Sequence, residues 1–410
     1  MLMSLSTEYA RVRHATRDLV AGLGPEDCMV QAMPDVSPAK WHLAHTTWFF
    51  ETFVLERELA GYASPSPAYR ELFNSYYDAV GPKHPRPERG HLSRPTLSEV
   101  LAYREHVDAG IQKLLARGGA SSELMELGLQ HEQQHQELLL MDVKYNFSKN
   151  PLVPRFQPQP LEPCGASEPL RFQRFDGGLV QAGASGSEFS FDNERPRHRR
   201  FLEPFELGTR LVTNAEMLAF IAAGGYQNPA LWLSEAWAWV REHAVAAPEY
   251  WRRDAEGAFH EFTAHGEVPL DPNAPVCHVS GYEAAAFALW AGARLPTEFE
   301  WELAARAAAE PSSLLRAGRL HPRGTSGAGV RQLFGDLWQW TRSGYEPYPG
   351  FVPEAGPVGE YNGKFMCGQW VLRGSSVATP NGHARVSYRN FFYPHQRWPF
   401  TGIRLARDPR

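Results

Sequence analysis

The chain has 410 residues, of which 43% are hydrophobic and 12% aromatic, and its 41 basic and 46 acidic side chains give a formal net charge of −5. This length exceeds that of one ordinary domain and predicts two domains. The apolar content excludes global disorder. No basic run is long enough to favour nucleic-acid binding, so we expect no nucleic-acid partner.

Targeting and redox features favour a cytoplasmic protein that does not enter a membrane. The first twenty residues are amphipathic and do not resemble a signal peptide. No window of about 18 uninterrupted apolar residues predicts a membrane span. The four cysteines form no CxxC pair, which is typical of a reducing compartment.

The first 150 residues carry apolar side chains at helical spacing. Four segments show this pattern: Tyr9–Leu23, Trp41–Leu59, Thr96–Leu115 and Ser121–Phe147. Ser93 or Thr96 is a candidate cap for the third segment, which has Pro95 near its start. Four such helices predict an antiparallel bundle, a fold that builds metal sites from facing side chains.

A different pattern begins after a proline-rich stretch, which predicts a linker over residues 151–169. Residues 170–410 combine short apolar pieces and many glycines with helices predicted at Val279–Ala291 and Glu298–Ala309. We therefore expect a two-domain α+β protein, with a helical bundle over residues 1–150 and a loop-rich α+β domain over residues 170–410.

The strongest chemical signal is the pair His131 and His135 inside the fourth predicted helix. Residues four apart share one face of a helix, so both imidazoles can reach one metal ion. His42 and His45 lie on another predicted helix and are candidates for a third ligand. Three neutral imidazoles with open positions suit a first-row transition metal that binds substrate and O2.

Two other interpretations compete with this metal site. Single histidines often have only a structural role, which is the simpler interpretation for His42. The sequence from His131 to His135 also matches H-E-x-x-H, the zinc-peptidase helix in which the glutamate activates water. A peptidase of this kind needs a third ligand downstream, and the proline-rich stretch that follows offers no clear one.

Several motifs resemble one known family across nearly the whole chain. Residues 37–52 (SPAKWHLAHTTWFFET), 72–94 and 131–140 (HEQQHQELLL) look like the DinB-like metal-binding bundle of ergothioneine-biosynthetic sulfoxide synthases. FDNERP, PVCHVSGYE, RLPTEFEWE and FGDLWQWT resemble the family's second domain, which is similar to formylglycine-generating enzymes and C-type lectins. The resemblance implies that this domain completes the substrate pocket.

The resemblance also implies an iron(II) ion held by His45, His131 and His135, with His42 as a neighbour. It implies O2 as co-substrate and hercynine (Nα-trimethylhistidine) as substrate. Formylglycine-generating enzymes act through a cysteine pair near the end of the fold. Cys367 stands alone in that region, so we do not expect their activity here.

Substrate-binding residues follow from the same motifs. The matching glutamine, Gln134, is expected to hydrogen-bond the hercynine imidazole. Phe391 and Phe392, with their neighbour Asn390, match positions that line the trimethylammonium site. Aromatic faces suit that group because cation–π contacts contribute about 0.5–2 kcal/mol each.

A tyrosine pair and a basic loop follow the second predicted helix. In related enzymes an active-site tyrosine steers the reaction to carbon–sulfur bond formation, and we assign this role to Tyr77, with Tyr76 as its neighbour. Lys83, Arg86 and Arg89 are candidates for binding the carboxylate of an amino-acid co-substrate, since a guanidinium fork suits that group.

The expected reaction joins cysteine or γ-glutamylcysteine to the imidazole carbon between the two ring nitrogens of hercynine. Selenoneine synthases, which resemble this family, join a selenosugar to hercynine instead. Departures from the family pattern leave the identity of the co-substrate open between the two, and they lie at Gln339, Gly368, Trp370, Ser375, Val377 and Pro399. A lectin-like binding protein with a degenerate bundle is a more remote alternative, which the intact histidine set disfavours.

Overall fold

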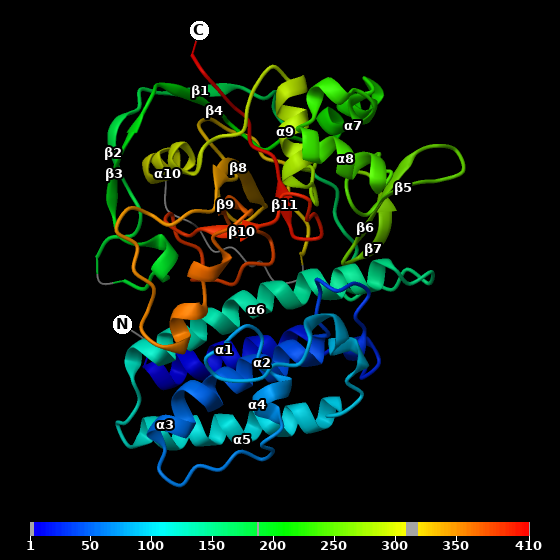
Figure 1. Ribbon diagram of the computed structural model, residues 1–410. Helices are drawn as coiled ribbons and strands as arrows, with labels where there is room; N and C mark the ends of the chain where they lie inside the picture. The colour runs from blue at the N-terminus through cyan, green and yellow to red at the C-terminus, as the bar shows by residue number, and fades with distance from the viewer. Residues whose placement is uncertain (1–3, 187, 309–318, 410) are drawn as a thin grey trace. The chain divides into compact units, whose positions relative to one another are not determined.

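The computed structural model describes residues 4–186, 188–308 and 319–409, which form two compact units (Figure 1). The bundle unit consists of Met1–Phe156 and Glu354–Tyr361, and the mixed unit consists of Gln157–Pro353 and Asn362–Arg410. The first is helical and the second combines helices with sheets, which confirms the predicted two-domain α+β fold class.

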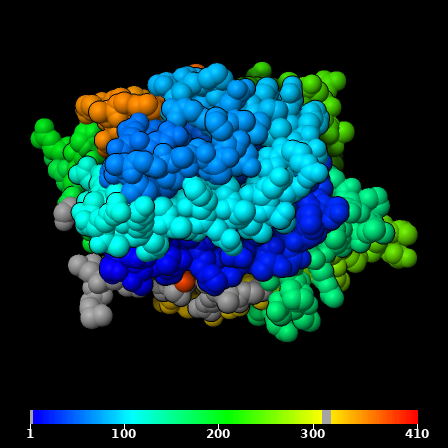
Figure 2. Space-filling view, turned by 90° about the horizontal axis from the view of Figure 1, so that it is seen from below, coloured from blue at the N-terminus to red at the C-terminus, as the bar shows by residue number. Residues whose placement is uncertain are grey.

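The bundle unit is built from four long helices that match the four predicted segments. Its helices are α1 (Leu5–Leu19), α2 (Ala39–Phe50), α3 (Glu56–Glu58), α4 (Tyr69–Leu72), α5 (Leu97–Ala116) and α6 (Ser122–Ser148). Thr96, one of the two predicted caps, begins α5 in a capping box with Glu99. In Figure 2 the cyan α5 runs beside the dark-blue α1.

Helix α2 is the centre of the bundle, because all twelve of its residues are buried. It contacts both α5 and α6, and it continues through a π-helical turn, η2 (Glu51–Leu55), into α3. Gly128 lets α6 approach it closely, since a Cβ there would lie 2.6 Å from Cε1 of Phe50. This approach places the histidines of α2 opposite those of α6.

A buried network of charges joins α1, α5 and α6. Arg13 Nη1 donates to Glu132 Oε2 at 2.9 Å, and Arg104 Nη2 donates to Glu132 Oε1 at 2.8 Å. Thr16 donates a third hydrogen bond to the same carboxylate at 2.6 Å. Arg13 also pairs with Asp108 at 2.7 Å. Each buried charge therefore has an opposite charge beside it, which burial requires.

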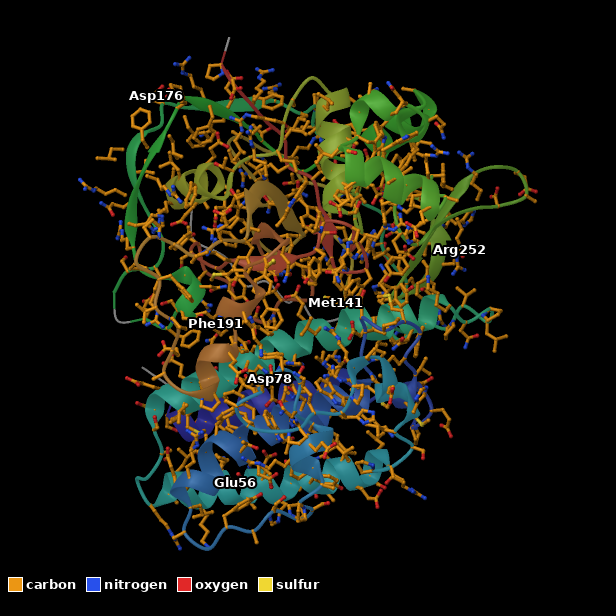
Figure 3. The ribbon with its side chains drawn as sticks, in the orientation of Figure 1. Glu56, Asp78, Met141, Asp176, Phe191 and Arg252 are labelled. Carbon is orange, nitrogen blue, oxygen red and sulfur yellow. The ribbon has the colours of Figure 1, made fainter. Side chains whose placement is uncertain are left out.

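A short segment from late in the sequence completes the bundle unit. Residues 354–361 contain the turn η7 (Pro357–Glu360), and the Glu360 carboxylate accepts hydrogen bonds from the backbone N–H groups of Asp78 and Ala79 at 3.0 and 2.8 Å. Asp78, labelled in Figure 3, directly follows the predicted tyrosine pair. The segment therefore fixes the loop that carries those tyrosines.

The described residues of the mixed unit form four small sheets. Its strands are β1 (Phe172–Phe175), β2 (Gly178–Ala182), β3 (His198–Leu202), β4 (Phe205–Gly208), β5 (Trp251–Arg253), β6 (Phe259–Thr263), β7 (Gly266–Pro269), β8 (Trp338–Gly344), β9 (Trp370–Gly374), β10 (Asn390–Phe392), β11 (Thr401–Gly402) and β12 (Ala406–Arg407). The strand orders are β1-β4-β12, β2-β3, β5-β6-β7 and β10-β9-β8-β11. All pairs are antiparallel except β8 with β11.

Helices of the mixed unit begin at strong caps. They are α7 (Asn214–Ala222), α8 (Ser234–Glu242), α9 (Gly281–Trp290) and α10 (Glu298–Ala307). Capping boxes formed by Ser280 and Thr297 start α9 and α10, the two helices predicted from the sequence. Ala309, the last residue of the second prediction, lies outside the described residues. None of the helices in the described ranges is both long and apolar enough to cross a bilayer.

Gly128→Ala is expected to loosen the contact between α2 and α6. Alanine gains about 1 kcal/mol in helix propensity over glycine, but overpacking against the ring of Phe50 costs about 1–3 kcal/mol. We expect a lower unfolding midpoint in denaturant and weaker metal binding. Gly110→Ala is the matched control in α5, because its nearest new contact would be the flexible tip of Leu55 at 2.9 Å, while the ring of Tyr62 lies at an ordinary 3.6 Å. Equal midpoints for the two variants would contradict this account.

Candidate metal centre

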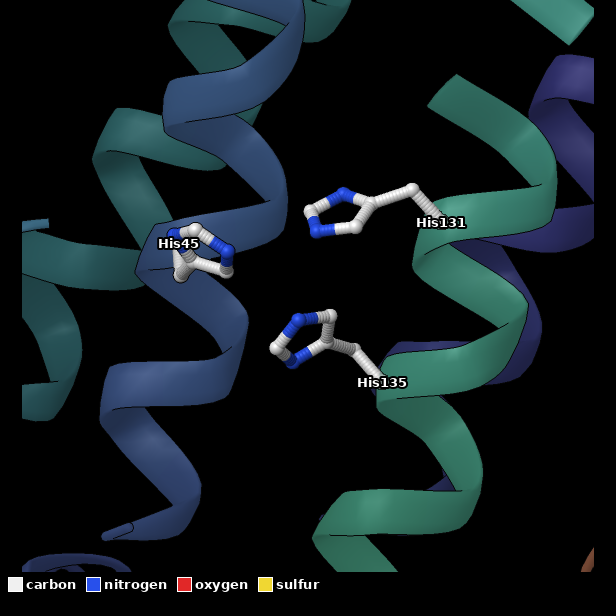
Figure 4. A group of neighbouring side chains, drawn as sticks. All are labelled: His45, His131 and His135. Atoms are coloured by element: carbon white, nitrogen blue, oxygen red, sulfur yellow. The ribbon is translucent and has the colours of Figure 1, made fainter. Parts of the chain in front are cut away.

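Three buried histidines face one another between α2 and α6 (Figure 4). His45 projects from α2, and His131 and His135 project from successive turns of α6. One ring nitrogen from each lies within 4.8 Å of those of the other two. This spacing suits three ligands of a single metal ion, and these are the three residues that the sequence motifs indicated.

Hydrogen bonds show which ring nitrogens are available. His45 Nδ1 lies 2.6 Å from the carbonyl oxygen of Phe73 and donates to it, so its Nε2 carries a lone pair. Nε2 of His45 and both ring nitrogens of His131 are buried without a hydrogen-bond partner among the described residues. Buried polar atoms are rarely left without a partner. The donor set therefore fits a metal ion.

The electrostatics of the site keep the imidazoles neutral. Burial lowers the pKa of all three, that of His131 to about 3. For His45 and His135 the neighbouring ring of His131 lowers the pKa further. A neutral imidazole offers a lone pair to a metal without first losing a proton. The site is thus prepared to bind a metal at neutral pH.

The glutamate of the H-E-x-x-H match does not take part in this site. Glu132 lies in the buried charge network with Arg13 and Arg104. Burial alone would raise its pKa, but the two guanidinium groups outweigh that effect and lower the pKa to about 2. A carboxylate held in this way cannot act as the base that activates water. The geometry therefore opposes the zinc-peptidase alternative.

Arg89 lies beside the metal centre and is 2% exposed. Its guanidinium stacks on the ring of Trp41 with 3.4 Å to the ring centroid, and Trp41 stacks on His45 with 4.6 Å between centroids. Its described hydrogen bonds go to the hydroxyls of Ser37 and Ser75 at 2.9 and 3.1 Å. Burial, then the nearby Arg86, lowers the pKa of Arg89 well below its usual range.

The other two basic candidates of this loop are exposed. Lys83 forms an ion pair with Asp78. Arg86 lies at the start of the short turn η3 (Arg86–His91) and donates a hydrogen bond to the carbonyl of Asp35. Of the three basic residues predicted to bind the co-substrate, Arg89 is therefore the one that is buried beside the histidines.

The predicted tyrosine pair lies in the loop that follows α4. Tyr77 is fully buried, and its ring contacts Trp48 and Phe53 with centroid separations of 5.6 and 5.2 Å. Trp48 in turn stacks on His45 at 5.6 Å. Burial raises the pKa of Tyr77, so its phenol keeps its proton. Tyr76 contacts Tyr77 at 4.6 Å.

A third phenol, Tyr361, was missed in the sequence analysis. Its ring makes an edge contact with the ring of His131 at 5.6 Å and lies 6.1 Å from the ring of Tyr76. It is 7% exposed and belongs to the segment that Glu360 fixes to the tyrosine loop. No spacing signal indicated it, because 230 residues separate it in sequence from His131.

The remaining predicted substrate residues lie on regular elements. Gln134 is half-buried on α6, directly before His135. Asn390, Phe391 and Phe392 form the half-buried strand β10 of the mixed unit. Phe391 stacks on Tyr345 with 4.1 Å between ring centroids. An aromatic cluster therefore exists at the predicted trimethylammonium residues.

Three of the departures from the family pattern have structural explanations. Gln339 is fully buried, and its side-chain oxygen accepts hydrogen bonds from Trp301 and Arg404 at 2.7 and 2.6 Å. The Ser375 hydroxyl accepts from the backbone of Gly335 at 2.8 Å. Gly368 has φ +67°, in the left-handed region that glycine and asparagine tolerate best. These positions need no altered co-substrate to account for them.

Comparisons with known proteins match both halves of the chain. The sulfatase-modifying factor enzyme 1-like domain matches residues 171–324 and 310–409, and the DinB superfamily matches residues 8–139. The formylglycine-generating enzyme of Streptomyces coelicolor is 30% identical over 303 residues, covering 60% of this chain and 93% of its own. Among solved structures, PvdO from Pseudomonas aeruginosa matches 58% of this chain and 94% of its own at 19% identity and a TM-score of 0.38.

Fold and site together define a DinB-type bundle with three facing histidines joined to a sulfatase-modifying-factor-like domain. Several relatives match both parts at once, and among them the hercynine oxygenase of Mycolicibacterium smegmatis is 33% identical over 436 residues, covering 99% of each chain. The chain belongs to the hercynine oxygenase family and is thus an enzyme of the oxidoreductase class. The resemblance inferred from the sequence motifs is confirmed.

His135→Ala is expected to abolish tight metal binding, because two imidazoles cannot replace a set of three converging ligands. The measurement is an anaerobic titration of metal-free protein with iron(II), followed by metal analysis after gel filtration. His106→Ala is the matched control: His106 lies exposed on α5, where it bonds the carbonyl of Ala63 at 3.2 Å. Stoichiometric iron retained by His135→Ala would disprove the ligand assignment.

Proposed function

We propose that this enzyme is a hercynine oxygenase that uses iron(II) and O2 to form a carbon–sulfur bond. It would join cysteine or γ-glutamylcysteine to the imidazole carbon of hercynine that lies between the ring nitrogens. The observation that carries the proposal is the buried histidine triad, in a chain that aligns from end to end with a hercynine oxygenase. Free cysteines at all four positions fit a cytoplasmic location.

Iron(II) is the metal that we propose for His45, His131 and His135. Three neutral imidazoles leave positions open on such an ion, which would supply sites for O2 and a thiolate together with redox chemistry. The protein's part is to hold the three rings in place and to exclude water from them. Burial of all three, with at most 8% of any one exposed, supports both roles.

Two sets of residues are proposed to hold hercynine. Gln134, on the helix that carries two of the ligands, can donate to or accept from the imidazole of the substrate with its amide. Phe391 and Phe392, with Asn390, are proposed for the trimethylammonium group, which cannot donate an ordinary N–H hydrogen bond. Their aromatic faces can attract this cation without any formal negative charge.

Arg89 supports a co-substrate that carries a carboxylate. The hydrogen bonds of Arg89 to described residues go to two hydroxyls, and the nearby carboxylate of Asp142 offsets the cost of its burial only in part. A carboxylate from cysteine or γ-glutamylcysteine would add an opposite charge in direct contact with the guanidinium, through a charge-assisted hydrogen bond. A selenosugar has no such group, so this residue favours the sulfur donor over the selenium donor.

Phenols near the histidines are proposed to supply a proton during bond formation. Tyr77 and Tyr76 were indicated by the sequence, and the ring of Tyr361 adds a third candidate in direct contact with His131. Burial raises the pKa of Tyr77, which keeps its phenol protonated and able to donate. A positioned acid of this kind contributes typically 10²–10⁴-fold to the rate.

A competition assay tests the proposed reaction. Iron(II)-loaded protein, hercynine and O2 would be offered cysteine, γ-glutamylcysteine and a selenosugar together, and products followed by mass. We expect a hercynine–cysteine type sulfoxide. A hercynine–selenosugar adduct as the main product would overturn the sulfur proposal, and no hercynine-derived product would overturn the function as a whole.

Arg89→Met provides the matched test of the carboxylate contact, with Arg86→Met as its exposed neighbour. Loss of a charge-assisted hydrogen bond costs about 1.5–3 kcal/mol, so we expect the KM for the thiol to rise at least 10-fold in Arg89→Met alone. The KM for hercynine should change little. Equal effects of both variants on the thiol would place the co-substrate elsewhere.

The tyrosines are distinguished by comparing Tyr361→Phe with Tyr77→Phe. Because Tyr361 contacts a metal ligand, we expect its variant to lose about 100-fold in carbon–sulfur product, in line with loss of a positioned acid. Tyr77→Phe should lose less, and thiol oxidation without hercynine should persist in both. The reverse order would make Tyr77 the donor, and unchanged product in both variants would exclude these phenols.

A further inference from the structure

His42, which the family resemblance placed next to the ligands without a role, links the ligand His135 to the buried carboxylate of Asp142. Its Nδ1 lies 2.9 Å from Nδ1 of His135, and its Nε2 lies 3.0 Å from Oδ2 of Asp142. The same Oδ2 accepts the backbone N–H of Ser37 at 2.8 Å. His42 and Asp142 are each 3% exposed, and His135 is 8% exposed.

Helix geometry explains why these three residues meet. His42 and His45 are three residues apart and share one face of α2. His135 and Asp142 are seven residues apart, or two turns, and share one face of α6. Polar side chains of the two helices therefore meet at the three facing histidines and also through His42.

The protons in this chain of contacts follow from the donors and acceptors. An ionised carboxylate has no proton to give, so Nε2 of His42 carries the hydrogen and donates it to Asp142. A neutral imidazole carries one proton, so the other ring nitrogen of His42, Nδ1, has a lone pair. That lone pair can only accept, and so Nδ1 of His135 must be the donor. Nε2 of His135 is then the atom with a free lone pair.

We propose that His42 and Asp142 are positioning residues that select Nε2 of His135 as the metal-binding atom and hold its ring in place. The proposal rests on the metal centre of the proposed function and adds residues that no part of that function assigned. Outer partners of metal-bound histidines commonly fix the tautomer and raise the basicity of the ligand. Here a second histidine stands between the ligand and the carboxylate.

The three ligands are consequently held in three different ways. His45 donates to a neutral backbone carbonyl, that of Phe73. His135 donates to a histidine that is itself polarised by a carboxylate. For His131 the described residues provide no partner at either ring nitrogen. We therefore infer that His135 is the most strongly electron-donating of the three and the ligand whose orientation is most firmly fixed.

The same geometry excludes His42 as a fourth ligand. Both of its ring nitrogens have hydrogen-bond partners, one at His135 and one at Asp142. The group of facing metal-binding atoms in the described part of the chain contains His45, His131 and His135 without it. A role through His135 is the one that remains for His42.

Nuclear magnetic resonance of metal-free protein labelled with 15N-histidine gives the first test, because nitrogen shifts distinguish the two tautomers. We expect His135 to carry its proton on Nδ1 and His42 to carry its proton on Nε2. His135 protonated on Nε2 would overturn the proposal. This measurement uses the wild-type chain, so it decides even if a variant fails to fold.

Cobalt(II) titrations followed by visible absorbance give the second test. We expect His42→Phe and Asp142→Asn to weaken cobalt binding by about 10–100-fold, the usual effect of losing an outer partner. His106→Phe is the control and should bind as the wild type does. Folded His42→Phe and Asp142→Asn variants that bind within about 3-fold of wild type would overturn the proposal. A wild-type protein that binds neither cobalt nor iron would instead overturn the proposed function.

Discussion

The structure of the bundle unit depends on one constraint: the histidines buried between α2 and α6 need a partner for each of their ring nitrogens. Buried polar groups need partners, and His45 and His135 find one partner each at the nitrogen that faces away from the centre. Their remaining lone pairs and the ring of His131 converge within 4.8 Å. The close approach at Gly128 makes this convergence possible. The metal centre is therefore a consequence of how α2 and α6 pack.

The charge network around Glu132 keeps the carboxylate of this α6 residue away from the three histidines. Residues 131 to 135 of α6 place two histidines on one face and a glutamate on another, and a free carboxylate near the centre would compete for the metal. Arg13 and Arg104 hold it away through hydrogen bonds of 2.9 and 2.8 Å. The same bonds connect α6 to α1 and α5. One residue thus stabilises the bundle and removes peptidase-like chemistry from the site.

Much of this could be predicted from the sequence, because local patterns determine it. Helical periodicity located the four long helices, and the spacing of His131 and His135 located the metal face. Choosing His45 over His42 required the family resemblance, since both lie on one face of α2. Tyr361 could not be predicted, because its contact with His131 joins parts of the chain that are far apart in sequence. The partners of Glu132 and His42 likewise depend on how helices pack, which spacing alone does not determine.

Arg89 shows how the fold and the proposed chemistry constrain each other. The guanidinium stacks on Trp41 and donates to two hydroxyls, and the nearby Asp142 carboxylate offsets only part of the cost of its burial. Arg13 and Arg104 differ from Arg89, because each of them forms a direct ion pair with Glu132. This contrast within one bundle is the basis for proposing that a carboxylate of the co-substrate pairs with Arg89. An amino-acid thiol would bring such a carboxylate and a neutral sugar would not, so the arrangement of charges supports the proposal of a sulfur donor.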